Sequence, residues 1–167
     1  MSRAFVKEHD DDAGDLPELP LSEHSNYVTS RGLAQLRARL GDAAQRFDAI
    51  TDDAADAKLL RAHLARELRW LQARIAGAIP VATENQPPDR VGFGATVELV
   101  DDDGQTYRYR IVGEDEADPE HALVSWVSPL ARALSGARVG DTVVWLRPAG
   151  DLNIEVMAID YAPGADA

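Results

Sequence analysis

Four aspartates, the side chains of this chain best suited to chemistry, lie close together in the sequence: Asp48, Asp52, Asp53 and Asp56. Carboxylate oxygens are the ligands that Mg²⁺ prefers, so two or three acids on an exposed turn can complete the coordination of an ion held mainly by other groups. Aspartate also caps helices and keeps turns soluble. From these residues alone the second role is the better explanation, and Asp52 and Asp53 stay candidate metal ligands.

Other catalytic and cofactor-binding patterns are missing from the sequence. It contains no phosphate-binding loop and no His-Glu-x-x-His motif, and its four histidines lack metal-ligand spacing. The pair Gly92 and Gly94 leads into a predicted strand and not a helix, so it is no dinucleotide fingerprint. Residues 115–118 spell a helicase string, Asp-Glu-Ala-Asp, but predict only an acidic, turn-rich loop. The sequence therefore predicts no catalytic residue and no cofactor of the chain's own.

Two predicted helices flank the acidic turn. Apolar residues recur at spacings of three and four on both sides of it, which predicts an a/d seam. The seam positions are Leu33, Leu36, Leu40, Ala43, Phe47 and Ile50, then Leu64, Leu68, Leu71, Ile75 and Ala78. A turn this short permits only an antiparallel hairpin. Residues 27–80 are therefore predicted to form a two-helix coiled-coil finger that starts near Thr29 or Ser30, with Trp70 covering its root against the next domain.

Charge is unevenly distributed along the chain. The net charge is −12, yet residues 27–83 carry +3, between −5 over residues 1–26 and −10 over residues 84–167. On charge alone, the simpler interpretation is a solvated two-helix bundle. The alternative is a basic shaft that tolerates a nucleic-acid backbone, with Arg39 and Arg46 facing RNA.

Composition narrows the class of protein. Hydrophobic residues make up 45% of the chain and cysteine is absent, which excludes disulfides and thiol catalysis. No apolar run approaches the ~18 residues of a membrane span, and the first residues are acidic and not an apolar signal core. We therefore expect a soluble, cytoplasmic monomer with no membrane contact. Residues 1–26 are predicted to form an acidic disordered tail, and residues 162–167 a second tail.

A second domain is predicted after a proline-rich linker at residues 81–90. Its hydrophobic period changes to two, and Gly104 marks a hairpin turn. Ser128 and Pro129 are expected to begin a short helix that ends at residue 134. The predicted strands cover residues 95–100, 105–112, 122–127, 142–147 and 153–161. Residues 91–161 thus predict a small antiparallel sheet with one short helix, and the whole chain is assigned to the α+β class.

Several short motifs follow one another in a recognisable order. Tyr27-Val28-Thr29-x-x-Gly32 opens the first helix, and Arg-Trp-Leu-x-x-Arg-Ile at residues 69–75 closes the second. Further motifs are Phe-Gly-Ala-Thr-Val at 93–97, Tyr-Arg-Ile-Val-Gly at 109–113, Asp-Glu-Ala-Asp at 115–118, Ser-Pro-Leu-Ala-Arg-Ala-Leu at 128–134, Val-Gly-Asp at 139–141 and Pro-Ala-Gly at 148–150. From residue 27 to residue 161 this series resembles the GreA/GreB family of bacterial transcript-cleavage factors, and GreB in particular.

The resemblance implies a fold and a role. The second domain would be FKBP-like and would dock at the rim of the secondary channel of RNA polymerase, while the finger enters the channel beside nascent RNA. Acids at the tip would help the polymerase hold its second Mg²⁺ and cleave backtracked RNA. The chain would then be no enzyme itself, because it lends groups to another active site. The polymerase-binding residues implied are Ser128, Pro129, Leu130, Ala131, Arg132 and Asp118.

The sequence departs from the family at the tip. The tip motif Asp-Leu-Lys-Glu-Asn is absent, and each arm is shorter by roughly two turns, or about 10 Å. Asp52 and Asp53 are therefore only chemical analogues of the family's acids, whereas the docking segment is retained. We expect channel occupancy with weak or no cleavage. The alternatives are a cleavage-stimulating factor, a non-cleaving regulator, and a prolyl isomerase or chaperone, which would need an open, aromatic-lined pocket.

Overall fold

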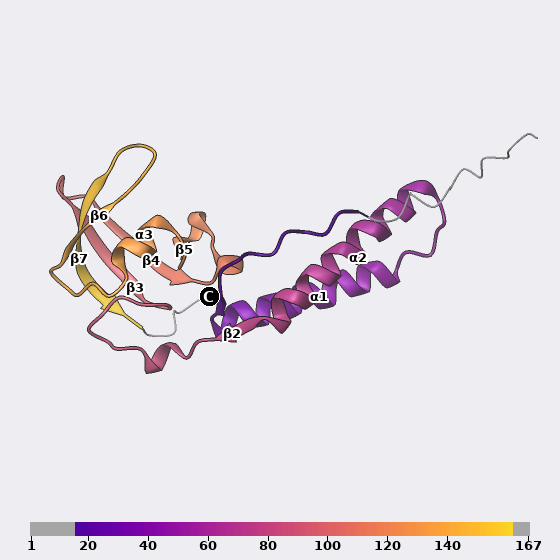
Figure 1. Cartoon of the computed structure of the whole chain (residues 1–167), viewed down its shortest axis with the longest axis horizontal. Helices are drawn as coiled ribbons and strands as arrows, with labels where there is room; N and C mark the ends of the chain where they lie inside the picture. Colours follow the sequence, from indigo (N-terminus) through magenta and orange to yellow (C-terminus); the bar gives the residue numbers. More distant parts are fainter. Residues whose placement is uncertain (1–15, 162–167) are drawn as a thin grey trace, which may run out of the picture. The chain divides into compact units, whose positions relative to one another are not determined.

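The computed structural model describes residues 16–161 (Figure 1). Contacts divide this part of the chain into two compact units. The helical unit comprises residues 16–21 and 37–76, and the sheet unit comprises residues 22–36 and 77–161. Residues 22–36 thus group with the sheet, although the sequence places residues 27–36 in the finger. Residues 1–15 of the predicted tail 1–26, and the whole predicted tail 162–167, lie outside the described residues.

Two long helices form the finger, as predicted. Helix α1 spans Ser30–Asp48 and helix α2 spans Ala55–Ala76, and the chain between them reverses direction (Figure 1). The most buried seam positions are Leu36, Ala43, Leu64 and Leu71. The predicted seam position Ala78 lies outside the helix, because α2 ends before Gly77 and the chain continues as a strand.

A pair of short strands, which the sequence did not predict, brackets the two helices. Strand β1 (Asn26–Val28) precedes α1, and strand β2 (Ala78–Pro80) follows α2. They pair in parallel, with Tyr27 opposite Ile79. Three residues are too few to show the period of two that marks a strand in a sequence. The sequence therefore did not separate these strands from the predicted finger, where β1 falls at the start and β2 at the end.

Strands β3 to β7 form one sheet in the order β5-β4-β3-β7-β6 (Figure 1). Their bounds are Thr96–Asp101 for β3, Thr106–Val112 for β4, Leu123–Ser125 for β5, Thr142–Trp145 for β6 and Leu152–Asp160 for β7. The predicted α+β class is confirmed. The sheet is mixed and not antiparallel, because β5 runs parallel to β4.

Two 3-10 turns explain the parallel pairing of β5. The chain leaves β4 through η2 (Glu114–Glu116) and η3 (Pro119–His121), and it returns so that Leu123 lies opposite Arg110. Ala122 adopts the left-handed conformation at φ 57°, which turns the chain into β5. The remaining 3-10 turn, η1 (Thr83–Asn85), lies in the predicted linker.

Helix α3 (Pro129–Leu134) covers part of the sheet, as predicted. The hydroxyl of Ser128 accepts a hydrogen bond from the amide of Ala131 at 3.2 Å, and Pro129 occupies the first turn. Leu130 and Leu134 belong to the core. The other buried members of this core are Val91, Ala95, Val97, Leu99, Ile111, Ala131, Ala137, Ile154 and Val156. No helix within residues 16–161 is long and apolar enough to cross a membrane.

Asp101 organises the turn between β3 and β4. One of its carboxylate oxygens accepts the amides of Asp103 and Gln105 at 3.0 and 2.8 Å, and the other accepts the hydroxyl of Tyr107 at 2.8 Å. Gly104 adopts the positive φ of 80° that this turn requires. Burial alone would raise the pKa of the Asp101 carboxyl, but the three hydrogen bonds outweigh it and hold that pKa below its ordinary value.

Replacing Asp101 with alanine is therefore expected to lower the melting temperature at pH 7 by several degrees. The pKa of this carboxyl is lower in the folded than in the unfolded state, so the charged form stabilises the fold at neutral pH. That contribution is lost as the pH falls through the folded pKa. The difference in melting temperature between wild type and variant should therefore shrink at low pH. Thermal unfolding at several pH values measures this. Asp103→Ala is the control, since its exposed side chain should hardly matter.

Candidate functional site

The tip of the finger is built from six exposed residues, 51–56. Helix α1 ends at Asp48, and α2 begins just before Asp56. Asp52 accepts a hydrogen bond from the amide of Ala54 at 3.0 Å, which orders the approach to α2. The turn chemistry expected of these aspartates is thus present at Asp52, and Asp53 is exposed beside it.

A second contact joins α2 to the end of the first arm of the finger. The guanidinium of Arg61 donates to the backbone carbonyl of Ile50 and lies 5.7 Å from the ring centroid of Phe47. Among residues 16–161, no three histidine or acidic side chains are grouped so that they could hold a metal ion. The exposed carboxylates of Asp52 and Asp53 can each offer an oxygen to an ion that other ligands hold.

The predicted docking segment, residues 128–134, separates into buried and exposed faces. Pro129 and Arg132 are exposed, and Ser128 is half-buried at the start of α3. Leu130 and Ala131 are only 2% and 4% exposed, because they pack into the core of the sheet unit. They therefore anchor α3 on the sheet, and their assignment to polymerase binding stays a prediction.

Asp118 also serves the local structure. Its carboxylate accepts the backbone amide of Glu120 at 3.1 Å and contacts Nδ1 of His121 at 2.7 Å. The hydrogen bond with His121 lowers the pKa of the Asp118 carboxyl, so the group is charged at neutral pH. Asp118 is half-buried and can still present an oxygen at the surface.

The two predicted shaft residues are both exposed on α1. Arg39 lies 3.9 Å from the carboxylate of Glu67 and 5.6 Å from the ring centroid of Trp70 on α2. Arg46 lies in the last turn of α1, where a cation is favourable for the helix dipole. The indole of Trp70 donates to the carbonyl of Pro20 at 3.1 Å, and its role in covering the root of the finger stays a prediction.

A buried carboxylate that the sequence analysis missed caps α1. Glu116 accepts the amides of Thr29 and Gly113 at 3.1 and 3.2 Å, and it also accepts the Thr29 hydroxyl. That hydroxyl in turn accepts the amide of Gly32 at 3.0 Å. The arrangement is a capping box in which the third helical residue is glycine and the carboxylate arrives from η2.

Gly32 is required by this arrangement. A Cβ built there would lie 2.1 Å from the carboxyl carbon of Glu116, and one built on Gly113 would lie 2.5 Å from the carbonyl oxygen of Tyr27. The sequence contains one sign of this cap. Thr29-x-x-Gly32 has the threonine of a capping box but a glycine where the glutamate usually stands. The contact ties residues 22–36 to the sheet unit, which explains the shifted unit boundary.

Comparisons with known proteins identify the class. The family model for transcription elongation factor GreA/GreB, C-terminal part, matches residues 86–161. Transcription elongation factor GreB of Pseudomonas aeruginosa is 35% identical over 161 residues, which cover 86% of this chain and 95% of that protein. The chain therefore belongs to the GreA/GreB family of transcription elongation factors.

Other relatives match over shorter stretches. GreB of Neisseria meningitidis (serogroup B) is 44% identical over 97 residues, which cover 58% of this chain and 60% of that protein. The chain thus spans less than two thirds of this relative. The crystal structure of GreA factor homolog 1 of Thermus thermophilus covers 82% of this chain and 99% of its own at 24% identity, with a TM-score of 0.41.

Proposed function

We propose that this chain binds RNA polymerase at the rim of its secondary channel and modulates elongation from there. Membership of the GreA/GreB family carries the proposal. In it, the sheet unit docks on the polymerase and the finger enters the channel beside nascent RNA. The chain is then an accessory factor whose effect depends on the active site of the polymerase.

The surface of α3 supports the docking role. Pro129 and Arg132 are exposed, and the buried Leu130 and Leu134 fix the helix rigidly on the sheet. A rigid, partly cationic helix surface suits a protein interface, because little side-chain freedom is lost on binding. Ser128, at the start of α3, and Asp118, at the start of η3, are half-buried polar groups that would add to the contact surface.

The tip supports modulation more than strong cleavage. Helix α1 has 19 residues and α2 has 22, and the acids of the tip lie on the short turn between them. A carboxylate helps as a direct Mg²⁺ ligand only near ~2.1 Å, so a small shortfall in reach removes that help. Asp52 and Asp53 would therefore act weakly, through water, on the Mg²⁺ that the polymerase holds.

In a stalled, backtracked polymerase complex, the wild-type chain is expected to shorten RNA little beyond the intrinsic rate. Asp52→Asn combined with Asp53→Asn should change that rate less than about twofold, since in this proposal neither carboxylate is a direct ligand of the ion. Gel analysis of labelled RNA measures the cleavage rate. Strong cleavage by the wild type that the double substitution abolishes would contradict the expectation and make the chain a working cleavage factor.

A further inference from the structure

Strand β6 lies at one edge of the five-stranded sheet, where its strand partner is β7 (Figure 1). At the opposite edge, the backbone of Asp118 covers part of β5, because it exchanges two hydrogen bonds of 2.9 Å with Leu123. Within residues 16–161, no segment besides β7 bonds to the backbone of residues 142–146 in this way. The outer side of β6 is therefore an open strand edge.

The backbone groups that face this edge follow from the ladder between β6 and β7. The carbonyl of Asp141 accepts the amide of Val156 on β7 at 2.9 Å. Every second residue of an antiparallel strand bonds to the same neighbour, so the ladder to β7 continues at residues 143 and 145. The amide and carbonyl groups of Val144 consequently point to the open edge, as do those of Thr142 and Leu146.

The side chains along this edge lack the features that normally keep two strand edges apart. Natural edge strands often carry charges or proline, which prevent another strand from pairing. Residues 142–146, Thr-Val-Val-Trp-Leu, contain neither, and their β-branched and aromatic members favour extended pairing. Val144 and Leu146 are 49% and 60% exposed. The segment is thus neutral and apolar, although residues 84–167 carry a net charge of −10.

The charges that flank the neutral segment suit a second copy of it. Asp141 precedes the segment and Arg147 follows it. When two such strands pair antiparallel about a two-fold axis through Val144, Asp141 of each copy lies opposite Arg147 of the other. The same register places Thr142 opposite Leu146, and Val144 opposite its own counterpart. Opposite charges on facing strands favour pairing, so both ends of the segment support this register.

We propose that the open edge of β6 is a self-association surface, at which two copies of this chain join their sheets into one continuous sheet. The inference goes beyond the proposed function, since the pairing needs no polymerase. A single pair of short strands buries less than the ~1,200 Å² of a stable interface, so the association is weak. The chain is then a monomer when dilute, as the sequence predicts, and a dimer when concentrated.

Analytical ultracentrifugation of the full chain from about 10 μM to about 1 mM tests the association, because weak complexes form in this range. We expect the mean mass to rise towards that of a dimer. Val144→Lys should weaken association about tenfold or more, since it places two like charges opposite each other at the two-fold axis. Met157→Lys is the matched control, because it adds the same charge at an exposed apolar residue of β7, which is paired on both sides.

Single cysteines test the register, because the chain has no cysteine of its own. Val144→Cys should form a disulfide-linked dimer under mild oxidation, since directly opposite residues lie about 5.5 Å apart, within the reach of a disulfide. Thr142→Cys is the control. In the proposed register its two thiols are offset along the strands by four residues, or about 14 Å, which is beyond that reach.

Three results would overturn the proposal: a monomer mass at every concentration, equal association of Val144→Lys and the wild type, or equal crosslinking by Val144→Cys and Thr142→Cys. Circular dichroism checks that each variant is folded. Polymerase binding by Val144→Lys is measured in parallel. If the wild type stays monomeric while Val144→Lys weakens polymerase binding, the edge contacts the polymerase and not a second copy, and the self-association proposal fails.

Discussion

Replacing Gly32 with alanine is expected to lower the free energy of unfolding by about 3 kcal/mol, because the new methyl group overlaps a buried, hydrogen-bonded carboxylate. The Cβ would lie 2.1 Å from the carboxyl carbon of Glu116, whose hydrogen bonds to Thr29 and Gly113 prevent an easy retreat. Urea unfolding of the full chain, followed by circular dichroism, measures the loss. The matched control is Gly41→Ala on the same helix, where nothing lies within 4 Å of the new Cβ.

The control should have the opposite sign. Alanine at position 41 is expected to stabilise α1 by about 0.5–1 kcal/mol, the usual gain over glycine inside a helix. Glu116→Ala should cost about 3 kcal/mol, since it leaves buried amides without an acceptor. Combining it with Gly32→Ala removes the clash, so the double variant should lose less than the two single variants together. Strict additivity would show that Gly32 and Glu116 do not share the proposed space.

The second large effect concerns docking. Pro129→Glu is expected to weaken binding to RNA polymerase by about tenfold or more, because it places a charge at the centre of the proposed contact surface. Glutamate is tolerated in the first turn of a helix, where the dipole favours an anion, so α3 should stay folded. Fluorescence titration of the labelled chain with polymerase measures the affinity, and circular dichroism checks the fold.

Two comparisons make the docking result specific. Arg132→Ala should also weaken binding, since Arg132 is exposed on the same short helix. Arg108→Ala is the control, because Arg108 is exposed on β4, where it contacts Glu98 at 3.8 Å and lies outside the proposed surface. Equal affinity of Pro129→Glu and the wild type would remove α3 from the interface.

The sequence predicted those parts of the fold that depend on local pattern. Leu36, Leu64 and Leu71 mark the seam because helical burial repeats every three or four residues. Ser128 and Pro129 mark the start of α3 because capping depends on adjacent residues. The family's order of motifs led from these elements to the GreA/GreB relationship.

What escaped prediction depends on contacts between distant residues. Glu116 lies 87 positions from Thr29, and no local pattern showed that a residue of an acidic loop would cap α1. The parallel direction of β5 depends on where two 3-10 turns lead the chain. The motif around Leu130 was predicted to form an exposed helix, whereas in the structure this side chain is buried in the core of the sheet unit.

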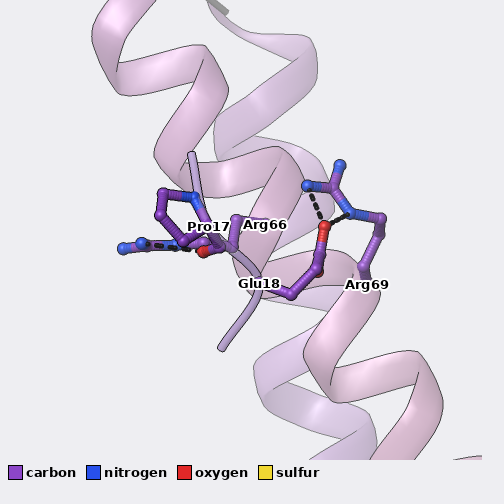
Figure 2. Close-up of polar contacts among 4 residues, drawn as sticks. All are labelled: Pro17, Glu18, Arg66 and Arg69. Carbon is purple, nitrogen blue, oxygen red and sulfur yellow. Dashed lines mark hydrogen bonds and ion pairs between the residues drawn. The ribbon is translucent and has the colours of Figure 1, made fainter. Parts of the chain in front are cut away.

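The contacts of residues 17–20 escaped for another reason. The composition of residues 1–26 predicts a disordered tail, and in the structure Pro17 and Glu18 (Figure 2), together with Pro20, contact α2. Two of these contacts use the carbonyl groups of Pro17 and Pro20, and a sequence pattern shows side chains and not backbone atoms. Asp52 and Asp53 at the tip stay predicted metal ligands, because an exposed carboxylate needs an ion that other groups hold.

Competition in a backtracked polymerase complex tests the central proposal most directly. GreB from a cleavage-competent relative is added to the complex at a fixed concentration, and this chain is added in increasing excess. We expect RNA shortening to slow as the chain occupies the secondary channel, while Pro129→Glu at the same concentrations leaves it nearly unchanged. Undiminished cleavage by GreB at saturating excess of the wild-type chain would contradict binding at that channel.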